Sequence, residues 1–177
     1  MKKKILFSIC GEGLGHVMST VGIMKLLSND YELKVLCYGD PLRYLEELGF
    51  DAVETYPDYA TSFTSKGVDL KKTVNLKDFL NRTRKAITIE DKIISDFKPD
   101  LIYSDSKIST IVLAHKNMIP CIVACNQTAL YHRLPPKLTK IPKIFSFIDL
   151  LLSFFSKFPM LKGVLIRDIP PLYDITE

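Results

Sequence analysis

A glycine-rich turn follows directly after a short apolar run near the start of the chain. The apolar run extends from Lys4 to Cys10, and residues 11–16 read Gly-Glu-Gly-Leu-Gly-His. A continuous apolar run that ends in glycine is typical of a central strand covered on both faces. Apolar residues recur at helical spacing from Val17 to Ser28, and Asn29-Asp30 then predicts a turn. This order of strand, turn and helix is typical of a layered α/β fold.

The alternation continues along most of the chain. Further strands are expected at residues 32–38, 51–55, 100–104, 120–125 and 163–169, and further helices at residues 41–48, 76–97 and 108–115. Alternating strands and helices favour parallel pairing. With 177 residues the chain fits one domain. The expected fold class is therefore a single α/β domain with a doubly wound, Rossmann-like parallel sheet.

The ends of the expected elements carry recognisable signals. Asp40 is expected to cap the helix that begins with Pro41, and Gly49 is expected to end it. Asn75 is expected to cap the long helix, which Lys98-Pro99 would stop. Residues 56–74 lose all periodicity, so they predict an irregular loop.

Composition excludes several classes of protein. The net charge of +4 is weak, and no basic helix with interleaved aromatic residues is present, so nucleic-acid binding is not expected. The four cysteines lie in or beside strand-like runs, and only Cys121 and Cys125 are close together, without a nearby histidine. Free cysteine in such runs is usually a small buried hydrophobe, so neither a metal site nor a cofactor is expected.

Two apolar segments bear on where in the cell the protein is expected. The opening residues resemble a signal peptide, but the stretch Ile5 to Cys10 is shorter than a secretory core, so a cytoplasmic protein is expected. The segment Ile141 to Phe158 is interrupted by Asp149 and is shorter than the roughly 20 residues that cross a bilayer. It is expected to pack on protein or to contact a membrane surface peripherally, and both interpretations stay open.

The glycine turn fits neither common nucleotide motif. Counting from Gly11 or Gly13, the third glycine of a dinucleotide fingerprint would fall on His16 or Met18. A phosphate loop fails as well, because Gly11 is followed five positions later by His16 and then Val17. The turn nevertheless follows a strand of an open α/β sheet, which is where such sheets bind ligands.

The pattern Gly-x-Gly-x-Gly-His after the first strand resembles the N-terminal loop of GT-B glycosyltransferases, including the MurG type and an archaeal and bacterial group of predicted glycosyltransferases. Other segments are similar to that family too. They are the strand Lys-Pro-Asp-Leu-Ile-Tyr-Ser-Asp at 98–105, Ile-Pro-Cys-Ile-Val at 119–123, Asn126-Gln127, and residues 167–171. The resemblance therefore covers most of the chain.

The resemblance implies a function and a site. Residues 1–177 would be the N-terminal, acceptor-side domain of an enzyme that transfers a sugar from a nucleotide-sugar donor to the hydroxyl of a sugar or lipid-linked acceptor, with inversion. His16 would be the general base, and Asp105 would orient it. Residues expected to contact the donor phosphates or substrate are Gly13, Leu14, Gly15, Asn126 and Gln127. The donor would be held mainly by a C-terminal domain or a separate subunit that this chain lacks, so the chain alone is expected to be inactive.

Simpler interpretations stay open. His16 could donate to a backbone carbonyl of its own loop, and Asp105 could serve only as the N-cap of the next helix. His115 and His132 fit structural roles better than catalytic ones. The alternative function is a non-catalytic nucleotide-binding, phosphate-binding or membrane-anchoring subunit that recruits a catalytic partner. A nucleotide-binding or flavodoxin-like domain of another chemistry is a third interpretation.

Overall fold

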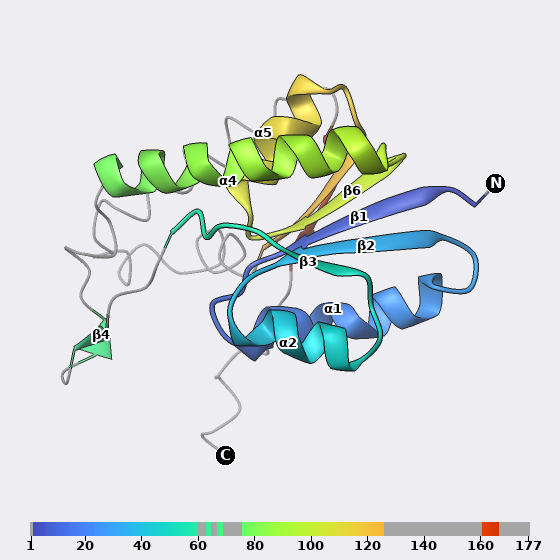
Figure 1. The fold of residues 1–177 in the computed structure, drawn as a ribbon, viewed down its shortest axis with the longest axis horizontal. Coiled ribbons are helices and arrows are strands. Elements are labelled where there is room, and N and C mark those ends of the chain that lie inside the picture. Colours follow the sequence, from blue (N-terminus) through green and yellow to red (C-terminus); the bar gives the residue numbers. More distant parts are fainter. Residues whose placement is uncertain (1, 60–62, 65–66, 69–75, 126–160, 167–177) are drawn as a thin grey trace, which may run out of the picture.

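The chain folds around a parallel sheet with the strand order β3-β2-β1-β6-β7-β8 (Figure 1). The computed structural model describes residues 2–59, 63–64, 67–68, 76–125 and 161–166. Each pair of neighbouring strands in the sheet is parallel. The strands are β1 (Lys4–Ile9), β2 (Glu32–Cys37), β3 (Ala52–Glu54), β6 (Leu101–Asp105), β7 (Cys121–Cys125) and β8 (Leu161–Ile166). The doubly wound α/β fold class is confirmed.

Helices cover both faces of the sheet. Figure 1 shows α1 (Leu14–Leu27) and α2 (Asp40–Glu47) on one face, and α4 (Leu76–Phe97) and α5 (Ile108–Lys116) on the other. Successive strand residues face opposite sides. In β1, Phe7 therefore packs in the core beneath α1, while Leu6 packs in the core beneath α4 and α5. The two cores explain why β1 reads as one continuous apolar run.

Several element boundaries differ from the expectations. Helix α1 begins at Leu14, three residues earlier than the apolar spacing indicated. Strand β6 begins at Leu101 and ends at Asp105, one residue later at each end than expected. Strand β8 begins at Leu161 and ends at Ile166, where residues 163–169 were expected. Such shifts of a few residues do not alter the topology.

Two predictions about the helix caps and the long loop were wrong. Asp40 is the first residue of α2, whose N-cap is Gly39 with φ 69° and no side-chain hydrogen bond. Gly39 therefore occupies the N-cap position that was expected for Asp40, and glycine adopts this positive φ without strain. The expected loop 56–74 contains the antiparallel strands β4 (Phe63–Thr64) and β5 (Gly67–Val68), which are too short to give an alternating pattern. Gly49 does end α2, with φ 82°, whereas Asn75 lies outside the described residues.

No helix in the described part of the chain combines the length and the apolar character needed to cross a membrane. The segment Ile141 to Phe158 lies outside the described residues, so its two interpretations stay as predictions.

Candidate functional site

The glycine turn lies where β1 and β6 end side by side. Ile9, the last residue of β1, is in register with Asp105, the last residue of β6. The N–H of Cys10 then donates to the carbonyl oxygen of Asp105 at 3.0 Å. The first turn of α1 starts four residues later and carries His16. The fold thus brings the end of β6 to the start of α1, at the edge where α/β sheets bind ligands.

The structural constraint on glycine differs among the three glycine positions of the turn. A β-carbon on Gly11 would clash with Tyr38. Gly13 has φ 88°, which side-chain-bearing residues rarely adopt. A β-carbon on Gly15 would meet nothing within 4 Å. Packing within the chain therefore requires glycine at position 11, and backbone conformation favours it at position 13, while neither accounts for glycine at position 15.

The start of α1 carries features of an anion-binding site. Its N-cap is Gly13, no side chain caps it, and its first turn contains no acidic residue. Free N–H groups at a helix N-terminus carry a partial positive charge and attract anions such as phosphate. Leu14 and Gly15 are exposed there. The expected phosphate contacts Gly13, Leu14 and Gly15 thus form one accessible surface.

His16 and Asp105 are in direct contact. The distance from His16 Nδ1 to Asp105 Oδ1 is 3.0 Å, and the side chains are 18% and 0% exposed. Thr20 donates to Asp105 Oδ2 at 3.3 Å, so α1 supplies a second partner to the same carboxylate. In the neutral tautomer that carries its proton at Nδ1, this contact is a hydrogen bond donated by the imidazole to the carboxylate. The other ring nitrogen, Nε2, is then available as an acceptor.

This contact bears on the simpler interpretations of both residues. The N-cap of α5 is Lys107, which has extended backbone and makes no side-chain cap bond, so Asp105 does not cap that helix. The ring nitrogen Nδ1 of His16 contacts a carboxylate from β6, 89 residues away, rather than a carbonyl of its own loop. The structure therefore brings together the two side chains that the family resemblance paired.

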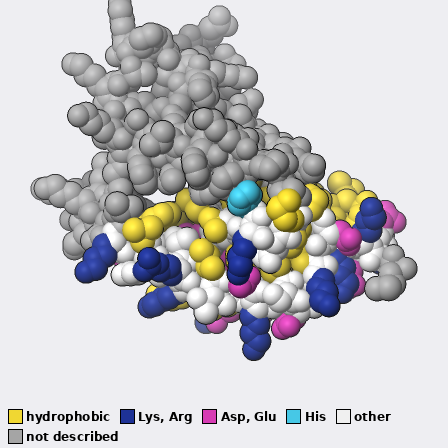
Figure 2. Space-filling view, turned by 90° about the horizontal axis from the view of Figure 1, so that it is seen from above, with side chains coloured by type: hydrophobic (Ala, Val, Ile, Leu, Met, Phe, Trp, Pro, Cys, Tyr) yellow, Lys and Arg dark blue, Asp and Glu magenta, His cyan; other side chains and the backbone are white. Residues whose placement is uncertain are grey.

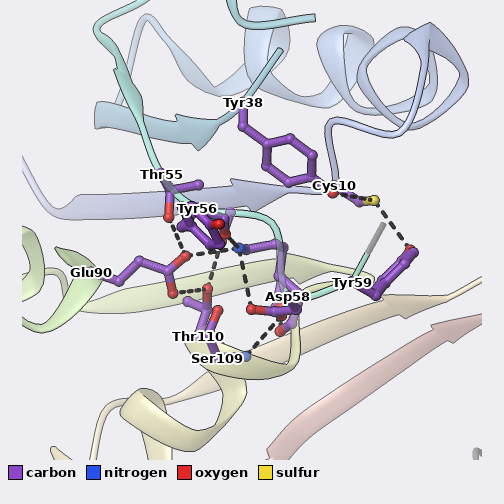
Figure 3. A network of polar contacts seen from close by, with 12 residues as sticks. Cys10, Tyr38, Thr55, Tyr56, Asp58, Tyr59, Glu90, Ser109 and Thr110 are labelled. Carbon is purple, nitrogen blue, oxygen red and sulfur yellow. Dashed lines mark hydrogen bonds and ion pairs between the residues drawn. The ribbon is translucent and has the colours of Figure 1, made fainter. Parts of the chain in front are cut away.

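A second polar cluster occupies the opposite face of the sheet at the same edge (Figure 3). Glu90 in α4 accepts hydrogen bonds from Thr55 at 2.5 Å and from Thr110 at 3.0 Å. Asp58 accepts the backbone N–H of Ser109 at 3.0 Å. Both carboxylates are completely buried. Sequence reasoning missed this cluster, although a glutamate on the buried side of the amphipathic α4 was a signal that could have revealed it.

Cys10 connects this cluster to the glycine turn. Its sulfur lies 3.2 Å from the hydroxyl groups of both Tyr38 and Tyr59. Burial, followed by the neighbouring Cys10, raises the pKa of both tyrosines far above the usual range. Both hydroxyls therefore stay protonated, and the contact of Tyr59 with Cys10 links the residues after β3 to the end of β1. Burial also raises the pKa of Cys37 and Cys121 to about 12, in keeping with the expected buried thiols.

The remaining candidate residues lie elsewhere or outside the described chain. Asn126 and Gln127 follow β7 immediately but are outside the described residues, as is His132. His115 is in α5, on the face opposite α1. Among the described residues no group of three or more histidine, cysteine, aspartate or glutamate side chains could hold a metal ion. On the face in Figure 2, lysine and arginine side chains are scattered among hydrophobic and acidic ones rather than gathered in one patch.

Residues 3–146 match the family model described as glycosyl transferase family 1. The chain belongs to this family. A relative in Methanosarcina mazei, an uncharacterized glycosyltransferase, is 30% identical over 126 residues, which cover 71% of this chain and 33% of the relative. The chain thus spans about a third of the length of the first two curated relatives that it matches, 33% of each.

Solved glycosyltransferases share the fold of this family member. The glycosyltransferase SsfS6 of Streptomyces sp. SF2575, complexed with thymidine diphosphate, has a TM-score of 0.60 at 18% identity, covering 96% of this chain and 50% of that protein. MurG of Acinetobacter baumannii has a TM-score of 0.58 at 16% identity, covering 93% of this chain and 45% of that protein. At these identities the likeness establishes the α/β fold alone.

Proposed function

We propose that this chain is the acceptor-binding half of an inverting glycosyltransferase, with His16 as the general base. The contact between His16 Nδ1 and Asp105 Oδ1, at 3.0 Å, is the observation that carries the proposal. It leaves Nε2 as the proton acceptor and gives the imidazole a partner of opposite charge once the proton arrives. Membership of glycosyl transferase family 1 supports sugar transfer as the reaction.

The proposed chemistry is a single displacement. His16 Nε2 takes the proton of the acceptor hydroxyl while that oxygen attacks the anomeric carbon of the donor sugar. The new glycosidic bond forms as the bond between the sugar and the diphosphate breaks, so the configuration inverts and the bond electrons leave with the nucleoside diphosphate. Asp105 stabilises the resulting imidazolium and keeps the ring orientation fixed. The buried position of Asp105 strengthens this electrostatic interaction.

The start of α1 is the proposed contact for the donor diphosphate. Gly13, Leu14 and Gly15 expose backbone at the positive end of the helix, and that end would stabilise charge that develops on the leaving group. The bare position at Gly15 leaves room for close approach. Asn126 and Gln127, which follow β7 in the sequence, are the proposed further contacts. A likeness in fold to SsfS6, a protein complexed with thymidine diphosphate, agrees with a nucleotide donor.

The rest of the proposed active site lies outside this chain. Because the curated relatives are about three times as long as the matched part, at 33% coverage, we propose that a C-terminal domain or a separate subunit holds most of the donor. The acceptor would bind on the side formed by the present chain, with a sugar or a lipid-linked sugar as its class. The present chain alone would then bind ligands but turn over slowly or not at all.

The test is sugar transfer by the chain joined to its donor half. Release of nucleoside diphosphate is measured with a panel of UDP- and TDP-sugars and sugar acceptors. We expect His16→Gln to lower turnover by about 10²- to 10⁴-fold, the usual contribution of a general base. His115→Gln, on the other face of the sheet, is the matched control and should keep turnover. A His16→Gln variant with full turnover would rule out His16 as the base. If the unchanged protein transfers no sugar from any donor of the panel, a non-catalytic binding or anchoring role would be favoured instead.

A further inference from the structure

A buried lysine is at the centre of the polar cluster on the face opposite His16. Lys107 is 1% exposed, and its ammonium lies 3.0 Å from Glu90 Oε1 and 3.5 Å from Asp58 Oδ1. It also donates to the carbonyl oxygen of Tyr56 at 2.7 Å. Lys107 follows β6, Glu90 is in α4, and Asp58 and Tyr56 follow β3. One side chain therefore joins three segments that are far apart in the sequence.

Stability alone gives little reason for such a group. Removing charges from water is costly, and buried ion pairs can often be replaced by apolar side chains without loss of stability. What the ionic cluster does supply is a defined geometry, because Lys107, Glu90 and Asp58 each have hydrogen-bond partners at fixed positions. The cluster therefore specifies where the residues around Lys107 lie.

The residues around Lys107 form the turn that carries Asp105. Ser106, between the two, has φ 58°, a left-handed conformation that a non-glycine residue adopts only when its surroundings hold it there. Its N–H donates to the carbonyl oxygen of Ala124 at 3.1 Å. The hydroxyl of Ser104 donates to the carbonyl oxygen of Lys107 at 2.7 Å. The turn is thus fixed at each residue from Ser104 to Lys107.

The two ends of this turn face opposite sides of the sheet. Asp105 contacts His16 and Thr20 on the α1 side. Lys107 contacts Glu90 on the α4 side. A shift of the lysine would therefore rotate or displace the aspartate through two backbone units. The cluster on one face and the pair of His16 and Asp105 on the other are thus joined by a short stretch of backbone through Ser106.

We propose that Lys107 is a positioning residue, which holds the turn after β6 so that Asp105 stays aimed at Nδ1 of His16. This inference rests on the proposed role of His16 as the base. Lys107 does not touch the reacting atoms. By binding Tyr56 and Asp58, the same lysine also fixes the start of the segment after β3 against this edge, so both sides of the site share one anchor.

The test reads the tautomer of His16 directly. Long-range proton–nitrogen correlation spectra of the ¹⁵N-labelled chain identify which ring nitrogen carries the proton, at about pH 9, where histidine is generally neutral. A His16→Gln spectrum assigns the signal. In the unchanged chain we expect one tautomer, protonated at Nδ1. In Lys107→Met we expect both tautomers, with the two ring-nitrogen shifts moving towards each other.

Lys116→Met is the matched control. Lys116 in α5 also pairs with a carboxylate of α4, Asp91 at 2.8 Å, but on the surface, so this variant should keep the single tautomer. If Lys107→Met does not fold, Asp58→Asn takes its place, since it removes one charge from the cluster at constant size. A folded Lys107→Met or Asp58→Asn variant with an unchanged His16 signal would overturn the inference. The tautomer is measured without substrate, so this failure is distinguishable from loss of the proposed transferase activity.

Discussion

Gly11 lies against the backbone of Tyr38 so closely that a β-carbon built on the glycine would be 2.1 Å from the tyrosine carbonyl oxygen. Because the obstacle is backbone, it cannot move aside as a flexible side chain would. Gly11→Ala should therefore push the turn away from the end of β2 and lower the free energy of unfolding by about 1 to 3 kcal/mol. Urea unfolding followed by circular dichroism measures this. Gly22→Ala, in the exposed part of α1, is the control and should leave stability unchanged or raise it by about 0.5 to 1 kcal/mol.

Gly15 offers the opposite prediction. A methyl group there meets no neighbour within the chain, so Gly15→Ala should fold normally and unfold at an equal or higher urea concentration. If the donor diphosphate approaches this backbone as proposed, the methyl group should weaken binding of UDP or TDP about tenfold or more, which corresponds to about 1.4 kcal/mol. Calorimetry on the chain joined to its donor half measures the affinity. Unchanged affinity would place the diphosphate elsewhere.

Asp105→Asn tests the partner of the base. The amide keeps the size of the carboxylate but removes the charge that stabilises the imidazolium. Its NH₂ group can also donate a hydrogen bond to Nδ1, which favours the tautomer that carries the proton at Nε2 and so cannot accept a proton there. We expect turnover to fall by about 10²- to 10⁴-fold, as for loss of the base itself. Steady-state kinetics of sugar transfer measure the effect. Asp91→Asn, on the surface of α4, is the control, and its turnover should be close to that of the unchanged enzyme. An Asp105→Asn variant with the same turnover as Asp91→Asn would argue against the orienting role of Asp105.

The buried thiols predict a loss of stability at alkaline pH. Burial raises the pKa of Cys37 and Cys121 from 9.0 to about 12. Above pH 9 an unfolded chain loses these protons while the folded chain keeps them, so the folded state becomes less favourable as the pH rises towards 12. Each thiol should contribute up to about 1.4 kcal/mol per pH unit in this window. Urea unfolding at a series of pH values, with and without Cys121→Ala, measures the slope, which should be shallower in the variant.

The same burial predicts slow chemical modification. Iodoacetamide reacts with thiolates, so Cys37 and Cys121 should be alkylated in the native protein only after unfolding. Mass spectrometry of peptides labelled before and after denaturation distinguishes the two cases. Rapid native labelling of either residue would contradict the burial that the structure assigns to it.

The sheet could be predicted from the sequence because its signals are local. The apolar run that forms β1 and the helical spacing after it need no knowledge of distant residues. The wrong prediction at Asp40 has a local cause as well, since two neighbouring residues could both serve as the cap and Gly39 took the position. Strands β4 and β5 were missed because two residues cannot show a period.

The site could be predicted only in part. A family resemblance singled out His16 and Asp105, and the structure places them in contact. Nothing local to Lys107 indicated that its ammonium would be buried, because Glu90 and Asp58 reach it from segments 17 and 49 residues away by position in the chain. Such a cluster is defined by tertiary packing, which periodicity does not encode. Asn126 and Gln127 stay predictions.

The separation of 89 positions between His16 and Asp105 in the sequence has a consequence for folding. No single helix, hairpin or crossover unit contains both, and they meet only after β1 and β6 have paired in the middle of the sheet. A fragment that stops before β6, or a state in which only the first half has formed, holds an imidazole with no carboxylate beside it. The protonation pattern of that ring is therefore a reporter of complete folding, and its denaturant midpoint should coincide with that of the whole domain.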